Sequence, residues 1–101
     1  VYKDLAENIY LQSWNGETAE LLYEAGAHDQ ESVNYGTYDE EFLYGFVEEE
    51  TQCTLIKLSW EGGYERGKTF TGVEKAVQLG FSVNHGVAGY WQNGQVIFEK
   101  V

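Results

Sequence analysis

The sequence predicts a mainly β protein, a single-domain antiparallel barrel or sandwich of about seven or eight strands with one short helix near 72–79. Short apolar runs with a period of two residues recur along the chain, as expected for half-buried strands. Hairpin-type turn signals separate these runs, most clearly Asn15-Gly16 and Asn93-Gly94. A chain of 101 residues with 43% hydrophobic content can bury one core, so we treat residues 1–101 as one domain.

The first third of the chain contains two candidate strands. Residues 1–7 are mixed polar and predict either an edge strand or a loose end. Residues 8–14 alternate as a strand. Residues 17–25 fit two structures, because their composition favours a helix that ends at Gly26 whereas the preceding Asn-Gly turn favours a strand. We take the strand, followed by a polar loop over 27–36.

The middle of the chain predicts three further strands. Residues 42–47 are apolar on both faces, which indicates a central strand that is packed on both sides. Residues 48–51 predict a turn or a strand end, and the long strand 53–60 follows. Residues 64–71 are mostly polar and predict an edge strand, because charged side chains such as Arg66 discourage edge-to-edge aggregation.

The predicted helix follows the edge strand. Thr71 and Glu74 have the spacing of a capping box, and Gly80 is a suitable stop. Residues 81–83 then lead as a short strand into the closing hairpin.

The closing hairpin spans 87–101. A type I′ turn at Asn93-Gly94 needs positive φ at both residues and places Gln92 opposite Gln95. Side chains alternate across a strand, so four apolar residues share one face. We expect that face to be the core face; its residues are Val87, Trp91, Val96 and Phe98.

The charge of the chain is concentrated in its first half. The formal net charge is −11, and residues 1–50 hold thirteen acidic side chains against one basic one, a net −12, which leaves +1 for residues 51–101. This distribution argues against direct binding to nucleic acid, which needs Lys and Arg, and against an anionic membrane surface. It suits a basic protein surface as partner, and it also promotes solubility. The oligomeric state is left open.

The sequence contains no catalytic signature. Cys53 is the single cysteine, which excludes an internal disulfide and favours a reducing compartment such as the cytoplasm, with a secreted protein left open. Its apolar strand predicts a buried structural thiol. His28, Asp29 and Glu31 lack the spacing of a zinc or calcium site. With no phosphate loop, nucleophile elbow or zinc-protease helix, we expect a non-enzymatic protein without metal or cofactor.

The leading functional hypothesis is a small acidic protein that blocks a basic surface of its partner, as an inhibitor, an immunity protein or a nucleic-acid mimic does. Acidic clusters alternate with tyrosines in the first half of the chain. The carboxylates would steer and pair with Arg and Lys, and the rings would bury area. The candidate partner-binding residues are Glu20, Tyr23, Glu24, Tyr38, Asp39, Glu40, Glu41, Glu48, Glu49 and Glu50.

The alternative hypothesis is a carbohydrate-binding β-domain of lectin-like type. Each tryptophan has a polar neighbour at a turn, and an exposed ring beside amides or carboxylates can stack on a sugar and bond its hydroxyls. The candidate sugar-binding residues are Trp14, Asn15, Trp60, Glu61, Trp91 and Gln92. A third interpretation places a small apolar ligand inside a barrel.

Overall fold

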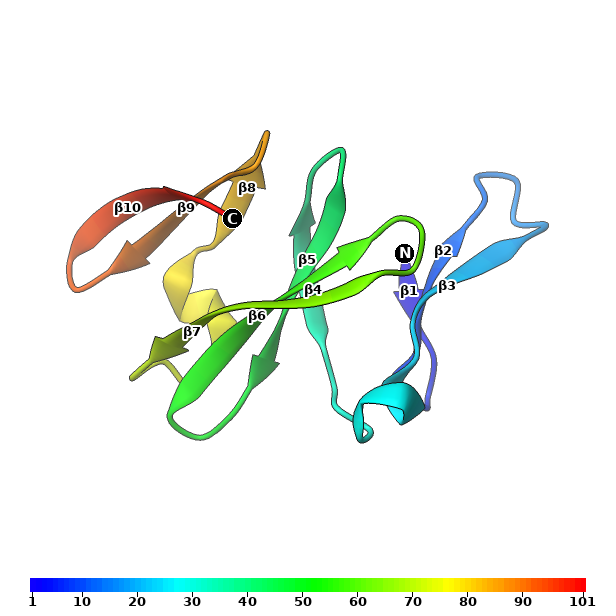
Figure 1. Ribbon diagram of the computed structural model, residues 1–101, viewed down its shortest axis with the longest axis horizontal. Helices are drawn as coiled ribbons and strands as arrows, with labels where there is room; N and C mark the ends of the chain where they lie inside the picture. The colour runs from blue at the N-terminus through cyan, green and yellow to red at the C-terminus, as the bar shows by residue number, and fades with distance from the viewer.

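The computed structural model describes residues 1–101 as three antiparallel sheets (Figure 1). The first sheet contains β1 (Tyr2–Lys3), β2 (Ile9–Gln12) and β3 (Ala19–Tyr23). The middle sheet contains β4 (Asn34–Tyr38), β5 (Phe42–Glu48), β6 (Gln52–Ser59) and β7 (Tyr64–Thr71). The third sheet contains β8 (Ser82–Asn84), β9 (Val87–Gln92) and β10 (Gln95–Lys100). The mainly β, antiparallel class is therefore confirmed, but no closed barrel forms.

The middle sheet is covered on both faces, and each face has its own core. Side chains alternate along β5 and β6, so Leu43 and Ile56 point to the first sheet, where they pack with Ile9. Phe46 and Leu55 point the other way and pack with residues of the third sheet. Figure 1 shows β1–β3 and β8–β10 at opposite ends of the molecule, with β4–β7 between them. The expectation that 42–47 is packed on both sides is confirmed.

Two predictions for the first half of the chain can be refined. The strand over 17–25 is confirmed as β3, and a single 3-10 turn, η1 (Ala25–His28), follows it. The predicted loop 27–36 is too long, because β4 begins at Asn34. β4 escaped prediction because its residues are polar and it is an edge strand, exposed along much of its length.

The predicted helix near 72–79 is reduced to one 3-10 turn, η2 (Ala76–Leu79). The predicted capping box of Thr71 and Glu74 is wrong, because the turn begins only after Lys75. The Lys75 backbone N–H donates instead to Gln78 Oε1, at 3.3 Å. Gly80 ends the turn with a positive φ of 55°. No helix in the structure has the length and apolarity needed to span a bilayer.

The closing hairpin has the predicted register but the opposite core face. Gln92 pairs with Gln95, and Asn93 and Gly94 have φ values of 53° and 75°, as a type I′ turn requires. Ala88 and Tyr90 are buried, whereas the expected core face is exposed at Val87, Trp91, Val96 and Phe98. Both faces of this hairpin are apolar, so alternation alone could not decide between them.

The physical reason for the reversal lies at Tyr90. Its ring meets Phe70 edge-on, with ring centroids 4.9 Å apart. Its hydroxyl donates to Glu99 Oε1 at 2.7 Å and accepts from Lys68 Nζ at 2.8 Å. A buried tyrosine needs a partner for its hydroxyl, and on this face Lys68 and Glu99 supply one each.

Candidate functional site: a carboxylate-lined hollow

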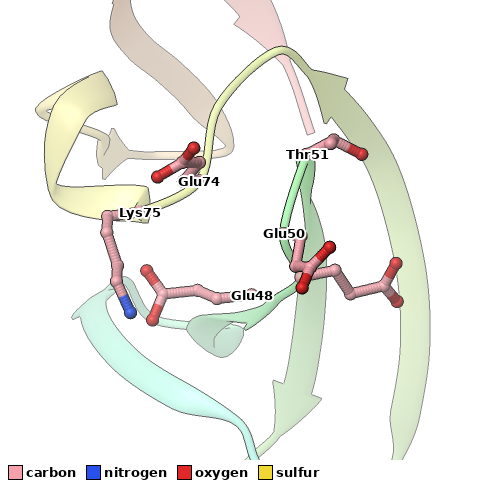
Figure 2. A pocket seen from close by; sticks show the side chains of 6 residues that line it. Glu48, Glu50, Thr51, Glu74 and Lys75 are labelled. Atoms are coloured by element: carbon pink, nitrogen blue, oxygen red, sulfur yellow. The ribbon is translucent and has the colours of Figure 1, made fainter.

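An open hollow of about 750 Å³ lies beside the β5–β6 turn, and its lining contains no hydrophobic residue. Two separate segments form it. One is the β5–β6 turn and the other is the connection from β7 to η2; the lining residues are Glu48, Glu49, Glu50, Thr51, Glu74 and Lys75. Figure 2 shows Glu48, Glu74 and Lys75 on one side of the hollow and Glu50 and Thr51 across from them.

Backbone hydrogen bonds hold the two segments in place. The turn is closed by the Glu49 N–H, which donates to the Gln52 carbonyl at 2.8 Å. The Gly72 N–H donates to the Thr51 carbonyl at 2.7 Å and ties the β7–η2 connection to the turn. The hollow is therefore a built feature of the middle sheet.

The four carboxylates of the hollow differ in how many hydrogen bonds they accept from the rest of the protein. Glu48 is half-buried and accepts from the Ala76 N–H at 2.6 Å and from the Asn34 side-chain amide. Glu49 accepts from the Gln52 side chain at 3.1 Å. Glu50 and Glu74 are exposed and accept no hydrogen bond, so their carboxylates are open to a partner.

The negative charge of the hollow is not neutralised by ion pairs within it. Ion pairs elsewhere use Lys3, Lys57, Arg66 and Lys68. Lys75 is the one basic side chain that lines the hollow, and it forms no ion pair with the four glutamates there. The balance at this place is strongly negative.

The three acidic clusters predicted as one binding face lie in different parts of the molecule. Glu40 and Glu41 follow β4, at the end of β5 opposite to Glu48–Glu50. Glu20 and Glu24 are exposed on and after β3, in the first sheet. Figure 1 shows the β4–β5 turn, the β5–β6 turn and the β2–β3 hairpin well apart. Glu48–Glu50 therefore form an acidic cluster that is separate from the other two.

Tyr23 is buried, contrary to the expectation of an exposed ring. Its exposure is 2%, and its hydroxyl donates to the Glu31 carbonyl at 2.6 Å. Its ring stacks on His28, with centroids 5.3 Å apart. Burial, and then the charge of Glu31, raise the pKa of Tyr23 to about 12. Tyr23 therefore belongs to the core.

Asp39 is also wrong as a surface residue. The residue is 8% exposed, and its carboxylate accepts from the backbone N–H groups of Glu41 at 2.9 Å and Phe42 at 3.0 Å. The Tyr44 hydroxyl donates to it at 2.8 Å and the Gly86 N–H at 3.2 Å. Burial by itself would raise the pKa of Asp39, but these hydrogen bonds outweigh burial and hold the pKa below its usual value. Asp39 joins the β4–β5 turn to the third sheet.

The remaining residues of this cluster are exposed. Tyr38 is 67% exposed and meets Trp60 edge-on at 6.2 Å between ring centroids. Glu40 contacts His85 Nδ1 at 2.8 Å. The hydrogen bond and charge of Glu40 raise the pKa of His85, and the same hydrogen bond lowers the pKa of Glu40.

The three tryptophans do not converge on one site. Trp14 is 99% exposed at the β2–β3 turn, where Asn15 Oδ1 accepts from the Ser13 hydroxyl at 2.7 Å. Trp60 is half-buried, and its Nε1 donates to the Asp39 carbonyl at 3.2 Å. Glu61, next to it, is exposed at the β6–β7 turn.

Trp91 and Gln92 are the two predicted sugar-binding residues that share a hollow. Trp91 is 53% exposed, and both residues line a recess of about 380 Å³ at the tip of the closing hairpin. Other polar lining comes from Thr71, Gln78 and Asn93. An indole beside several amides is the chemistry expected for a carbohydrate subsite.

The remaining groups considered for chemistry are the single cysteine and possible metal ligands. Cys53 is buried, and its thiol lies 3.2 Å from the Val73 carbonyl. Burial, and then the charge of Glu48, raise the pKa of Cys53, which disfavours the reactive thiolate. No group of three or more His, Cys, Asp or Glu side chains is arranged to hold a metal ion.

Sequence reasoning missed Thr51, Glu74 and Lys75. The last two lie on a segment distant in the sequence, where the spacing of Glu74 from Thr71 predicts a helix cap instead of a binding residue. No short motif in the sequence links that segment to the β5–β6 turn, because the link is the backbone hydrogen bond between Gly72 and Thr51.

Comparisons with protein-family models, with curated proteins and with solved structures give no match.

Proposed function

We propose that this protein is a non-enzymatic binding protein that holds a basic surface of a partner protein in the hollow at the β5–β6 turn. The observation that carries the proposal is the set of four glutamates around one open hollow, with two carboxylates unoccupied and a single lysine nearby. Arg and Lys side chains are the groups that such carboxylates bind.

The fixed geometry of the hollow supports selective binding. Glu48 is held by two hydrogen bonds and Glu49 by one, so less side-chain freedom is lost when a guanidinium enters. The remaining acidic residues of the chain extend the negative field and would speed the encounter with a basic partner. Occupation of that surface would block it, in the manner of an inhibitor or a nucleic-acid mimic.

The test is a titration of a fluorescently labelled arginine-rich peptide with two matched charge-reversal variants. Glu50→Lys/Glu74→Lys changes the hollow, and Glu17→Lys/Glu61→Lys changes two exposed glutamates at other turns. The two variants have the same net charge. We expect the first to weaken binding roughly tenfold more than the second, which corresponds to about 1.4 kcal/mol. Equal weakening would show that net charge alone binds the peptide.

Salt gives a second readout of the same proposal. Exposed charges are screened beyond about 8–10 Å near physiological ionic strength, so affinity should fall steeply as salt is added. Binding that is insensitive to salt would contradict an electrostatic site.

A second candidate function, carbohydrate binding, is favoured by the recess at Trp91. Its test is a glycan array followed by titration with two tryptophan variants. Trp91→Ala should abolish binding to any glycan that is found, whereas Trp14→Ala, which removes a still more exposed ring outside the recess, should leave it unchanged. A glycan that binds both variants alike would exclude the recess.

A further inference from the structure

β10 is the one edge strand longer than three residues whose pairing with its neighbour is uninterrupted, and its charged residues lie only at its C-terminal end. Edge strands expose unpaired N–H and C=O groups, which natural proteins protect with short strands, bulges or charges. β1 and β8 have two and three residues. The pairings of β3, β4 and β7 are interrupted by register shifts, and β7 also carries charged residues. β10 has six residues that pair with β9 without interruption.

The register shows which backbone groups of β10 are free. In an antiparallel pair, hydrogen-bonded and non-hydrogen-bonded residue pairs alternate. The tight turn closes on the pair Gln92 and Gln95, and the Val101 N–H donates to the Gly86 carbonyl at 3.1 Å. Both bonded residues on the β10 side have odd numbers. The odd-numbered residues of β10 therefore form the hydrogen bonds to β9. The N–H and C=O groups of Val96, Phe98 and Lys100 therefore point away from the sheet, where no other strand pairs with them.

The same part of β10 has an exposed apolar face. Val96 is 55% exposed and Phe98 is 74% exposed, and Trp91 lies opposite Val96 on the neighbouring strand. A strand added at the edge would place its own side chains beside Val96 and Phe98 and would bury part of both.

We propose that two copies of this chain associate through their β10 strands, antiparallel and around a two-fold axis, to form one continuous sheet. The edge is self-complementary, because Phe98 would face either Phe98 or Val96 of the second copy when the free groups pair. Charge permits a second copy at this place: Glu99 and Lys100 are the one acidic and the one basic side chain of β8–β10, so this sheet carries no net charge although the whole chain carries −11. The acidic hollow lies on other elements, so this inference goes beyond the function proposed above.

The experiment measures the mass of the purified protein in solution as a function of concentration, with a matched pair of substitutions. Val96→Lys places a charge on the edge. Val77→Lys makes the same change at a valine on η2 that is 85% exposed and lies outside β10. We expect wild type and Val77→Lys to reach twice the monomer mass, and Val96→Lys to remain monomeric. A monomeric wild type at the highest attainable concentration overturns the proposal, and so does a Val96→Lys protein that stays dimeric.

Amide hydrogen exchange shows whether a dimer uses this edge and needs no substitution. The Val96 and Phe98 amides should exchange fast in dilute protein and slowly in concentrated protein, whereas the Ile97 amide, bonded to β9, should be protected in both. A dimer in which the Val96 and Phe98 amides still exchange fast would be formed by another surface and would refute the pairing.

Discussion

Replacing Asp39 by asparagine should destabilise the protein because the carboxylate serves four donors. One oxygen accepts from the Glu41 and Phe42 N–H groups, and the other from the Tyr44 hydroxyl and the Gly86 N–H. The asparagine side chain would keep one oxygen to accept from the Glu41 and Phe42 N–H groups. Its NH₂ group would replace the second oxygen and would face the Gly86 N–H, so that two donors would meet. Hydrogen bonds to a charged group contribute about 1.5–3 kcal/mol each and neutral ones about 0.5–1.5 kcal/mol, so the expected loss is about 2–4 kcal/mol.

Urea unfolding at neutral pH measures this loss, with Glu41→Gln as the control. Glu41 is exposed and its side chain accepts no hydrogen bond, so its substitution should change the free energy of unfolding by less than about 0.5 kcal/mol. If Asp39→Asn is as stable as Glu41→Gln, then Asp39 does not hold the β4–β5 turn to the third sheet and the reasoning is refuted.

The stabilisation by Asp39 should also depend on pH, in a direction that its pKa determines. The pKa of Asp39 is lower in the folded protein than its ordinary value of 3.8, so the stabilisation is complete above that pH and is lost as the pH falls through the folded value. The difference in stability between wild type and Asp39→Asn should therefore shrink in acid. A difference that stays constant down to the acid transition would contradict a charged clamp.

Three further predictions concern single positions. Trp91→Ala should change the free energy of unfolding by less than about 1 kcal/mol because Trp91 is half-exposed, whereas Phe70→Ala, at a buried ring, should cost about 3–5 kcal/mol; thermal melts distinguish them. Gly94→Val should cost about 1–3 kcal/mol in the same melts, because φ is 75° there and a β-branched residue is strained at positive φ. Glu40→Gln should lower the pKa of His85 in an NMR titration of the imidazole signals, since Glu40 raises it in wild type; an unchanged pKa would show that the pair does not form in solution.

Local signals in the sequence were sufficient for most strands and for the closing turn. The Asn93-Gly94 turn fixes the register of the hairpin through backbone geometry, which needs no information from the rest of the chain. The continuous apolar run 42–47 correctly indicated a strand covered on both faces. These features depend on neighbouring residues only.

Features that depend on tertiary contacts could not be predicted. Both faces of the closing hairpin are apolar, so the sequence pattern does not show that the face with Trp91 is exposed. Which face is buried depends on the contacts of Tyr90 with Phe70 and Lys68. Asp39 resembled its acidic neighbours in sequence, and its donor Gly86 lies in the second half of the chain. The hollow likewise joins two segments that only the folded middle sheet brings together.

The central claim, that the hollow at the β5–β6 turn is the binding site for basic groups, is tested most directly by NMR. A ¹⁵N-labelled wild-type sample is titrated with an unlabelled arginine-rich peptide at physiological salt, and amide shifts are followed. We expect the largest shifts at Glu49, Glu50, Thr51, Glu74 and Lys75, which line the hollow. Shifts spread evenly over the other exposed glutamates, such as Glu17, Glu20 and Glu61, would contradict the claim and reduce the interaction to attraction by net charge.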